Sequence, residues 1–260
     1  MNDSELKDFL NSKVDFYNQP SFIASDPVSV PHQFSRQQDI EIAGFFAAIF
    51  AWGNRTTIIN KSNELMQLMD MDPYGFIQHH GKKDLKKLER FKHRTFNSTD
   101  LLYCVEFFKM HYAKNNSLES AFTRGMQQTD ITVENGLKGF YDYFFSLPYV
   151  PERTKKHIAT PEKKSSCKRL NMFLRWMVRS DDKAVDFGIW KKIAPSQLII
   201  PIDVHVARVA RQLRLLQTDK TNWDTALELT AYLRTLDAAD PVKYDFALFG
   251  TGVMEKPGYP

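Results

Sequence analysis

The sequence predicts an all-α protein. Apolar residues recur at helical spacing through most of the 260-residue chain, whereas the alternating pattern of a strand is nearly absent. Capping residues followed by proline, as in Asp72-Pro73 and Asp240-Pro241, mark helix boundaries. With 43% hydrophobic and 25% charged residues the composition is that of a folded globular chain, long enough to bury one sizeable core or two smaller lobes.

The N-terminal half predicts four helices. The first covers residues 36–52, has a nearly continuous apolar surface and ends at Gly53. Asn54 is a suitable cap for the second helix, which we expect to run as far as Asp72-Pro73. The third begins at Ser98 or Thr99, and the fourth covers residues 133–144, which include Gly136 and Gly139.

The composition changes near residue 147. Residues 147–166 contain three prolines and no apolar periodicity, which predicts a loop. Residues 153–169 are strongly basic, with Glu162 as their only acidic residue. This change predicts an N-terminal helical lobe over residues 1–150 and a C-terminal helical region over 151–260, joined in one integrated fold.

Four helices follow in the C-terminal region. The first begins at Ser165 or Ser166, and prolines then bracket an extended apolar segment over residues 196–200. Asp203 caps the next helix because its carboxylate can accept from the free amides of the first turn. The remaining two cover residues 223–236 and the stretch opened by Asp240-Pro241.

Composition also limits the classes of protein to which the chain can belong. Two cysteines, Cys104 and Cys167, can form neither a disulfide framework nor a four-cysteine iron–sulfur site. No metal-ligand spacing is present, so we expect neither a metal nor a cofactor. The N-terminal residues are acidic and the longest apolar run is too short to cross a bilayer, so the expected compartment is the cytoplasm. Nothing in the sequence requires an oligomer, and we expect a monomer.

Lys168 is the first candidate for chemistry. It lies in the first turn of its helix, where the helix dipole disfavours a cation and makes the neutral amine easier to reach. A neutral lysine amine can attack the anomeric carbon of a nucleoside and form a Schiff base. The alternative is a solvated lysine on a polar face, which is the commoner role of lysine.

Asp203 is the second candidate. By itself it is a helix cap, but a capping carboxylate can also stabilise positive charge on a sugar or help to activate a nucleophile. The pairing of Lys168 with the segment Pro201-Ile202-Asp203-Val204-His205 resembles the helix-hairpin-helix (HhH-GPD) DNA glycosylase superfamily, especially its 8-oxoguanine-removing members. The separation of 35 positions between the two residues is similar to that in the archaeal branch.

This resemblance covers about residues 159–253 and implies a two-lobed HhH-GPD fold that binds damaged DNA. It implies a glycosylase that removes a damaged purine through a lysine Schiff base on Lys168, assisted by Asp203, with possible strand cleavage by an AP-lyase step. Gly53-Asn54-Arg55 lies where related enzymes carry a loop that wedges into the duplex, although local chemistry favours the simpler interpretation of a glycine stop followed by an asparagine cap. The expected nucleic-acid contacts are Asn54, Arg55, Lys155, Lys156, Lys163, Lys164, Ser165, Ser166, Arg169 and His205.

The sequence departs from that superfamily at the hairpin. A Gly-x-Gly turn is usual there because glycine lets backbone amides approach a phosphate, but this chain has Glu162-Lys163-Lys164-Ser165. The departure favours a second hypothesis, a non-catalytic nucleic-acid-binding protein of the same fold. The chain as a whole is also similar to an uncharacterised bacterial family, on a run at residues 167–177, and that similarity implies the same fold without an activity.

Overall fold

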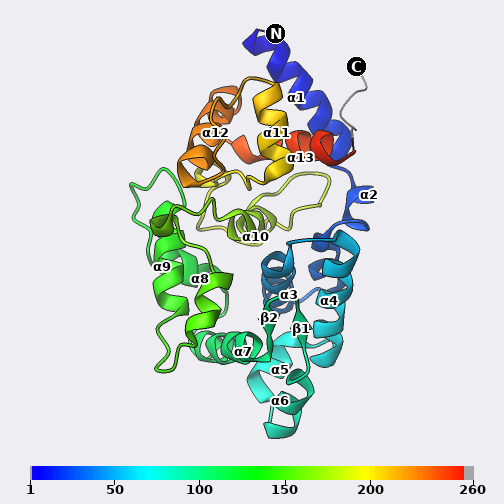
Figure 1. Ribbon diagram of the computed structural model, residues 1–260, viewed down its shortest axis with the longest axis vertical. Coiled ribbons are helices and arrows are strands. Elements are labelled where there is room, and N and C mark those ends of the chain that lie inside the picture. The colour runs from blue at the N-terminus through cyan, green and yellow to red at the C-terminus, as the bar shows by residue number, and fades with distance from the viewer. Residues whose placement is uncertain (1, 255–260) are drawn as a thin grey trace. The chain divides into compact units, whose positions relative to one another are not determined.

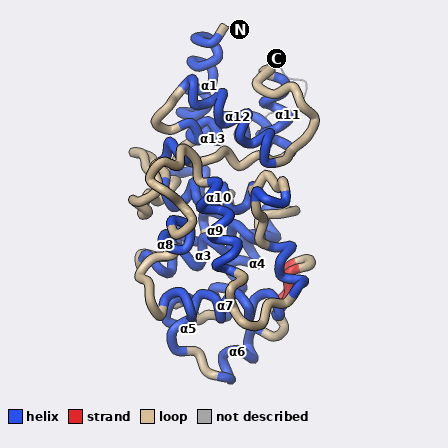
Figure 2. The backbone as a smooth tube through the Cα atoms, turned by 90° about the vertical axis from the view of Figure 1, so that its left-hand side faces the viewer, coloured by secondary structure: helices blue, strands red, loops and turns tan. Residues whose placement is uncertain are grey.

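The computed structural model describes residues 2–254, which are predominantly helical (Figures 1 and 2). Within the described residues, the strands are limited to β1 (Lys92–His93) and β2 (Phe96–Asn97), which form one antiparallel hairpin. The chain divides into two compact units. Unit 1 comprises Met1–Phe22, Gln128–Glu134 and Thr160–Pro260, and unit 2 comprises Ile23–Gln127 and Asn135–Ala159. The expected lobes, residues 1–150 and 151–260, are each continuous in sequence. The observed units differ from them, because each unit combines segments that are distant in sequence.

Unit 2 contains the helices predicted for the N-terminal half. Asn54 caps α4, with its side-chain oxygen accepting from the Thr57 amide at 3.0 Å. The prediction that this helix continues to Asp72 is wrong, because Asp70 and Met71 adopt left-handed backbone angles and turn the chain. Asp72 instead caps α5. The principal elements are α3 (Gln37–Phe50), α4 (Arg55–Leu68), α5 (Pro73–His79), α6 (Lys82–Leu88), α7 (Ser98–Tyr112), α8 (Glu119–Thr123) and α9 (Glu134–Phe144), followed by the 3₁₀ helix η3 (Glu152–His157).

The core of unit 2 is aromatic. Phenylalanines of α3, α7 and α9 contact one another, and Phe122 of α8 stacks on Phe140 with ring centroids 4.0 Å apart. Gly139, whose place inside a helix weakened the sequence-based assignment, lies against the backbone of Gly125. A Cβ atom at Gly139 would approach the Gly125 Cα to 2.7 Å, so the close packing of these segments requires glycine.

Unit 1 is built on the C-terminal helices and on α1, which the sequence analysis did not anticipate. A capping box between Asn2 and Glu5 opens α1, and this pair is the signal by which the helix could have been found. The helix α13 packs against both α1 and α11. The elements of the unit are α1 (Asp3–Tyr17), α10 (Lys168–Val178), α11 (Val204–Gln212), α12 (Trp223–Leu236) and α13 (Tyr244–Met254), with 3₁₀ turns η4 (Pro161–Lys163), η5 (Pro195–Gln197) and η6 (Pro241–Lys243).

Two predictions in this unit need correction. The helix expected from Ser165 or Ser166 begins at Lys168, because Lys164 and Cys167 both have left-handed angles, with φ of 54° and 50°. Ser165 instead forms an isolated β-bridge with Asn222. The segment expected to be extended over 196–200 begins inside the 3₁₀ turn η5. Across the described part of the chain, no helix is both long and apolar enough to span a membrane.

Candidate functional site

The fold of unit 1 brings Lys168 and Asp203 together. The Lys168 Nζ atom lies 3.7 Å from Asp203 Oδ2, although the two residues are 35 positions apart in sequence. Their side chains are 26% and 19% exposed, so both are reachable from solvent yet partly shielded from it. A partly exposed ion pair of this kind contributes at most about 1 kcal/mol to stability, so stability alone gives little reason to place these residues together.

The two carboxylate oxygens of Asp203 have different partners. Oδ1 accepts from the amides of His205 and Val206, at 2.9 and 3.0 Å, and so caps α11. Oδ2 faces the amine of Lys168. The capping role predicted from sequence is therefore confirmed, and it leaves one oxygen of the carboxylate directed at the lysine.

Lys168 is the first residue of α10, directly after the left-handed Cys167, and no side chain caps this helix. Its amine is thus held near the positive end of the helix dipole while its charge faces Asp203. The neighbouring Cys167 is buried, and that burial raises the pKa of its thiol to about 12. The thiolate form of Cys167, which nucleophilic attack would require, is therefore scarce at neutral pH.

Asp245, at the start of α13, is a buried carboxyl whose charge interacts with both members of the pair. Burial raises the pKa of Asp245 to about 6, and the nearby charge of Asp203 acts in the same direction. The attraction of Arg175, with which Asp245 is hydrogen-bonded, offsets only part of this effect, as does the attraction of Lys168. The carboxyl is thus poised to change its charge close to neutral pH.

We expect Asp245→Asn to alter the pH dependence of stability. In the parent protein the folded state keeps the Asp245 proton up to about pH 6, whereas the unfolded chain loses it near pH 4, so stability falls as pH rises across that interval. The variant lacks this contribution. The difference in free energy of unfolding between parent and variant should change by roughly 2–3 kcal/mol between about pH 4 and pH 7. Urea unfolding at several pH values measures it, and a constant difference would contradict the assignment.

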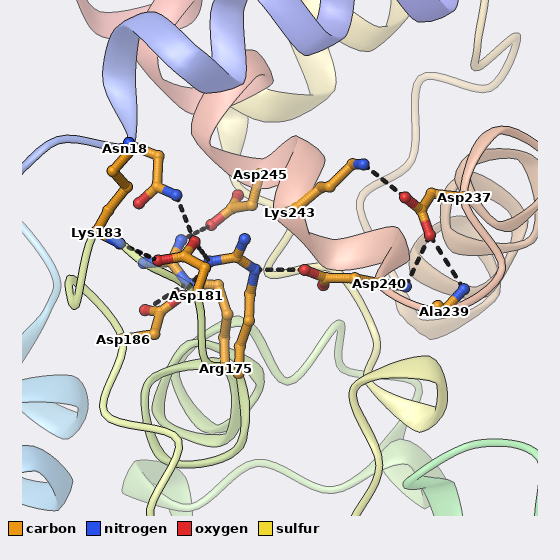
Figure 3. A network of polar contacts seen from close by, with 11 residues as sticks. Asn18, Arg175, Asp181, Lys183, Asp186, Asp237, Ala239, Asp240, Lys243 and Asp245 are labelled. Atoms are coloured by element: carbon orange, nitrogen blue, oxygen red, sulfur yellow. Dashed lines mark hydrogen bonds and ion pairs between the residues drawn. The ribbon is translucent and has the colours of Figure 1, made fainter.

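Asp245 belongs to a network of buried charges along α10 (Figure 3). Arg175 contacts Asp186 through Nε at 3.2 Å and Asp245 through Nη1. Arg179, one turn further on, contacts Asp186, Asp181 and Asp240. Burial lowers the pKa of Arg179, but the surrounding carboxylates outweigh it and the net effect is to raise that pKa. Each buried arginine is therefore compensated by more than one carboxylate, as a desolvated cation requires.

The sequence alone does not predict this network. Arg175 follows Lys168 by seven positions, so two helical turns place both side chains on the same side of α10. The signal available in the sequence was Arg175, the one charged residue inside the otherwise apolar run from Phe173 to Val178, because arginine is rarely buried without a partner. The acidic partners could not be identified, since Asp186, Asp240 and Asp245 come from three other segments.

The other expected contact residues of unit 1 differ in their surroundings. Lys163 and Lys164 are exposed, and the Ser165 hydroxyl accepts from the Cys167 amide at 3.2 Å. The Ser166 carbonyl accepts from Asn171 at 3.0 Å. Arg169 is half-buried, and burial lowers the pKa of its guanidinium. His205 is exposed, and its ring lies edge-on to that of Phe249 with the ring centroids 6.5 Å apart.

Four of the expected contact residues lie in unit 2. Asn54 is exposed and engaged as the cap of α4, and Arg55 follows it as the first residue of that helix. Lys155 and Lys156 belong to η3, where Lys155 pairs with Glu152 at 2.6 Å. The basic segment at 153–169 is therefore divided between the two units. Only its later part shares a unit with Lys168 and Asp203.

Among the described residues, no group of three or more His, Cys, Asp or Glu side chains is arranged to hold a metal ion. Residues 26–254 match a family described as a protein of unknown function (DUF2400). The chain belongs to the DUF2400 family. Neither the curated proteins nor the solved structures gave a match to this chain. Family membership brings no activity, so the function of this DUF2400 protein has to be argued from the site.

Proposed function

We propose that this DUF2400 protein is a DNA glycosylase that removes a damaged purine through a Schiff base on Lys168. The observation that carries the proposal is the 3.7 Å approach of the Lys168 amine to the free oxygen of Asp203. A nucleophilic lysine amine needs a proton acceptor, and a negative charge then stabilises the positive imine that forms on the sugar. Oδ2 of Asp203 can serve first as the proton acceptor and, once the purine has taken that proton, as the negative charge, because only Oδ1 is used in capping α11.

The proposed reaction begins when Asp203 takes a proton from the Lys168 ammonium. The amine nitrogen then bonds to C1′ of the sugar while the glycosidic bond breaks, and its electron pair leaves with the purine. The purine takes the proton held by Asp203. The nitrogen lone pair next expels the ring oxygen, which is protonated from the nitrogen, and a protonated imine links Lys168 to C1′. Because the target base must leave the stack to be reached, the substrate is a flipped nucleotide.

Borohydride trapping tests the proposal. The protein is incubated with duplexes that carry 8-oxoguanine, uracil or an abasic site, and borohydride reduces the imine to a stable amine. We expect a covalent adduct with the parent and none with Lys168→Gln. The matched control is Lys191→Gln, which removes an exposed lysine from the same unit and should leave the adduct unchanged. An adduct that persists in Lys168→Gln would exclude Lys168 as the nucleophile.

A second candidate is a nucleic-acid-binding protein of the same fold without turnover. It is favoured by the turn before α10, where the amides of Lys163 and Lys164 are hydrogen-bonded to the carbonyls of Thr160 and Pro161, at 3.2 and 2.7 Å. Amides used in this way are not available to a phosphate, unlike those of a glycine-rich hairpin. Salt-sensitive DNA binding without any trapped adduct would favour this candidate over the glycosylase.

A further inference from the structure

Unit 2 carries a second strongly basic segment that the chemistry above does not use. Residues 82–94 contain seven Lys and Arg against only Asp84 and Glu89, a net charge of +5. The whole chain has a net charge of +4, so the remainder is slightly acidic. The positive charge of this protein is therefore concentrated rather than spread evenly over its surface. The segment comprises α6 and β1 and ends in the turn that leads to β2.

The cations of this segment face solvent. Lys82, Lys83, Arg90 and Lys92 are exposed, and within the described residues none of them has an ion-pair partner. Lys87, by contrast, contacts Asp70 and Asp84 at 3.1 and 3.5 Å. Of the apolar residues of the segment, Leu88 and Phe91 are buried and Leu85 is half-buried. The exposed surface is therefore charged without an apolar centre, unlike the core of a protein–protein interface.

Arg94 extends this surface to the Gly53-Asn54-Arg55 loop. It occupies the turn between β1 and β2 with φ of 55°, a left-handed conformation that costs an arginine about 1 kcal/mol. Its guanidinium lies over the Trp52 ring, 5.1 Å from the ring centroid. Gly53 makes room for it, because a Cβ atom there would be 2.4 Å from Arg94 Nη1.

The hairpin that presents Arg94 is held from both sides. The His93 Nε2 atom is 3.0 Å from the carbonyl of Phe50, at the end of α3. Arg153 donates to the Thr95 carbonyl at 2.8 Å. Arg94 is therefore a strained residue on a fixed turn, where it stacks on an aromatic ring and faces solvent. Strain of this kind is typical of positions at which function outweighs local stability.

We propose that the surface formed by Lys82, Lys83, Arg90, Lys92 and Arg94 binds the phosphate backbone of duplex DNA. It deepens the proposed function and rests on it, because it adds to the lysine chemistry of unit 1 a separate contact on unit 2 for the same substrate. Exposed guanidinium and ammonium groups can pair with the phosphates of a duplex, and such contacts carry no sequence preference. The surface begins beside Asn54 and Arg55, so it continues the loop expected to meet the duplex.

The test measures binding of the full-length protein to an undamaged duplex by fluorescence anisotropy as salt is varied. The triple variant Lys83→Gln, Arg90→Gln, Lys92→Gln should lose roughly 2–3 from the slope of log K against log salt, and affinity should fall at least about 30-fold near 0.1 M salt. The matched control, Lys7→Gln, Lys114→Gln, Lys220→Gln, removes three other exposed lysines and the same total charge. Its slope should change by less than about 1.

Arg94→Asn provides an independent check, because asparagine tolerates the left-handed turn. DNA affinity should fall while the melting temperature stays the same or rises, a combination that a merely structural arginine would not give. The proposal would be overturned if the two triple variants lost DNA affinity equally. It would also be overturned if the Lys83→Gln, Arg90→Gln, Lys92→Gln variant lost affinity for polyglutamate as much as for DNA. Borohydride trapping separates the two proposals: a slope loss confined to the first triple, with no adduct from any protein, leaves the surface standing and removes the lysine chemistry.

Discussion

Replacement of Asp203 by asparagine is expected to slow base excision by roughly 10²–10⁴-fold, the usual contribution of a positioned proton acceptor. Asparagine caps a helix as well as aspartate does, so the bonds to the His205 and Val206 amides survive while the negative charge facing Lys168 disappears. The single-turnover excision rate on the duplex that gives an adduct with the parent measures the effect. Thermal unfolding of the same variant should be almost unchanged.

Two further substitutions separate the cap from the chemistry. Asp203→Ser keeps a capping oxygen without charge and should be as inactive as the asparagine variant. Asp203→Ala removes both functions and should also lose about 1 kcal/mol of stability. An asparagine variant that excises within about 10-fold of the parent rate would show that Asp203 only caps α11.

Arg175→Met is expected to lower the free energy of unfolding by about 3–5 kcal/mol, because it leaves Asp245 buried beside Asp203 without its cation. Methionine keeps much of the packing volume, so the loss reports mainly on charge. Without Arg175 the Asp245 carboxylate can lose its unpaired charge by taking a proton. The loss of unfolding free energy should therefore be smaller at pH 5 than at pH 8. Urea unfolding at both pH values measures it.

Lys183→Gln is the control for this substitution. It removes a partly exposed cation whose ion-pair partner is the exposed Asp182, and the unfolding midpoint should not move. The double variant Arg175→Met, Asp245→Asn should recover part of the stability lost in the single variant, because no unpaired charge then remains at position 245. A single variant that loses less than about 1 kcal/mol would contradict the buried network as a stabilising element.

Local signals determined much of the fold. The helical period and the caps predict α3, the Asn54 cap of α4 and the whole of α12 correctly, because each depends on residues close together in the sequence. Asp203 was assigned as a cap for the same reason. The HhH-GPD fold stays a prediction, while membership of the DUF2400 family and a predominantly helical structure are established. The pairing of Lys168 with Asp203 was proposed from a resemblance, and the structure places the two side chains in contact.

Only the tertiary structure decided the rest. The start of α10 depends on left-handed backbone angles at Lys164 and Cys167. Neither residue is a glycine, so the sequence gives no signal for these angles. The raised pKa of Asp245 arises from burial and from charges on other segments, and the sequence carries no information on burial of a single carboxyl at a helix start. Helical period and caps are local properties that neighbouring residues encode, whereas desolvation and charge pairing depend on segments that meet only when the chain has folded.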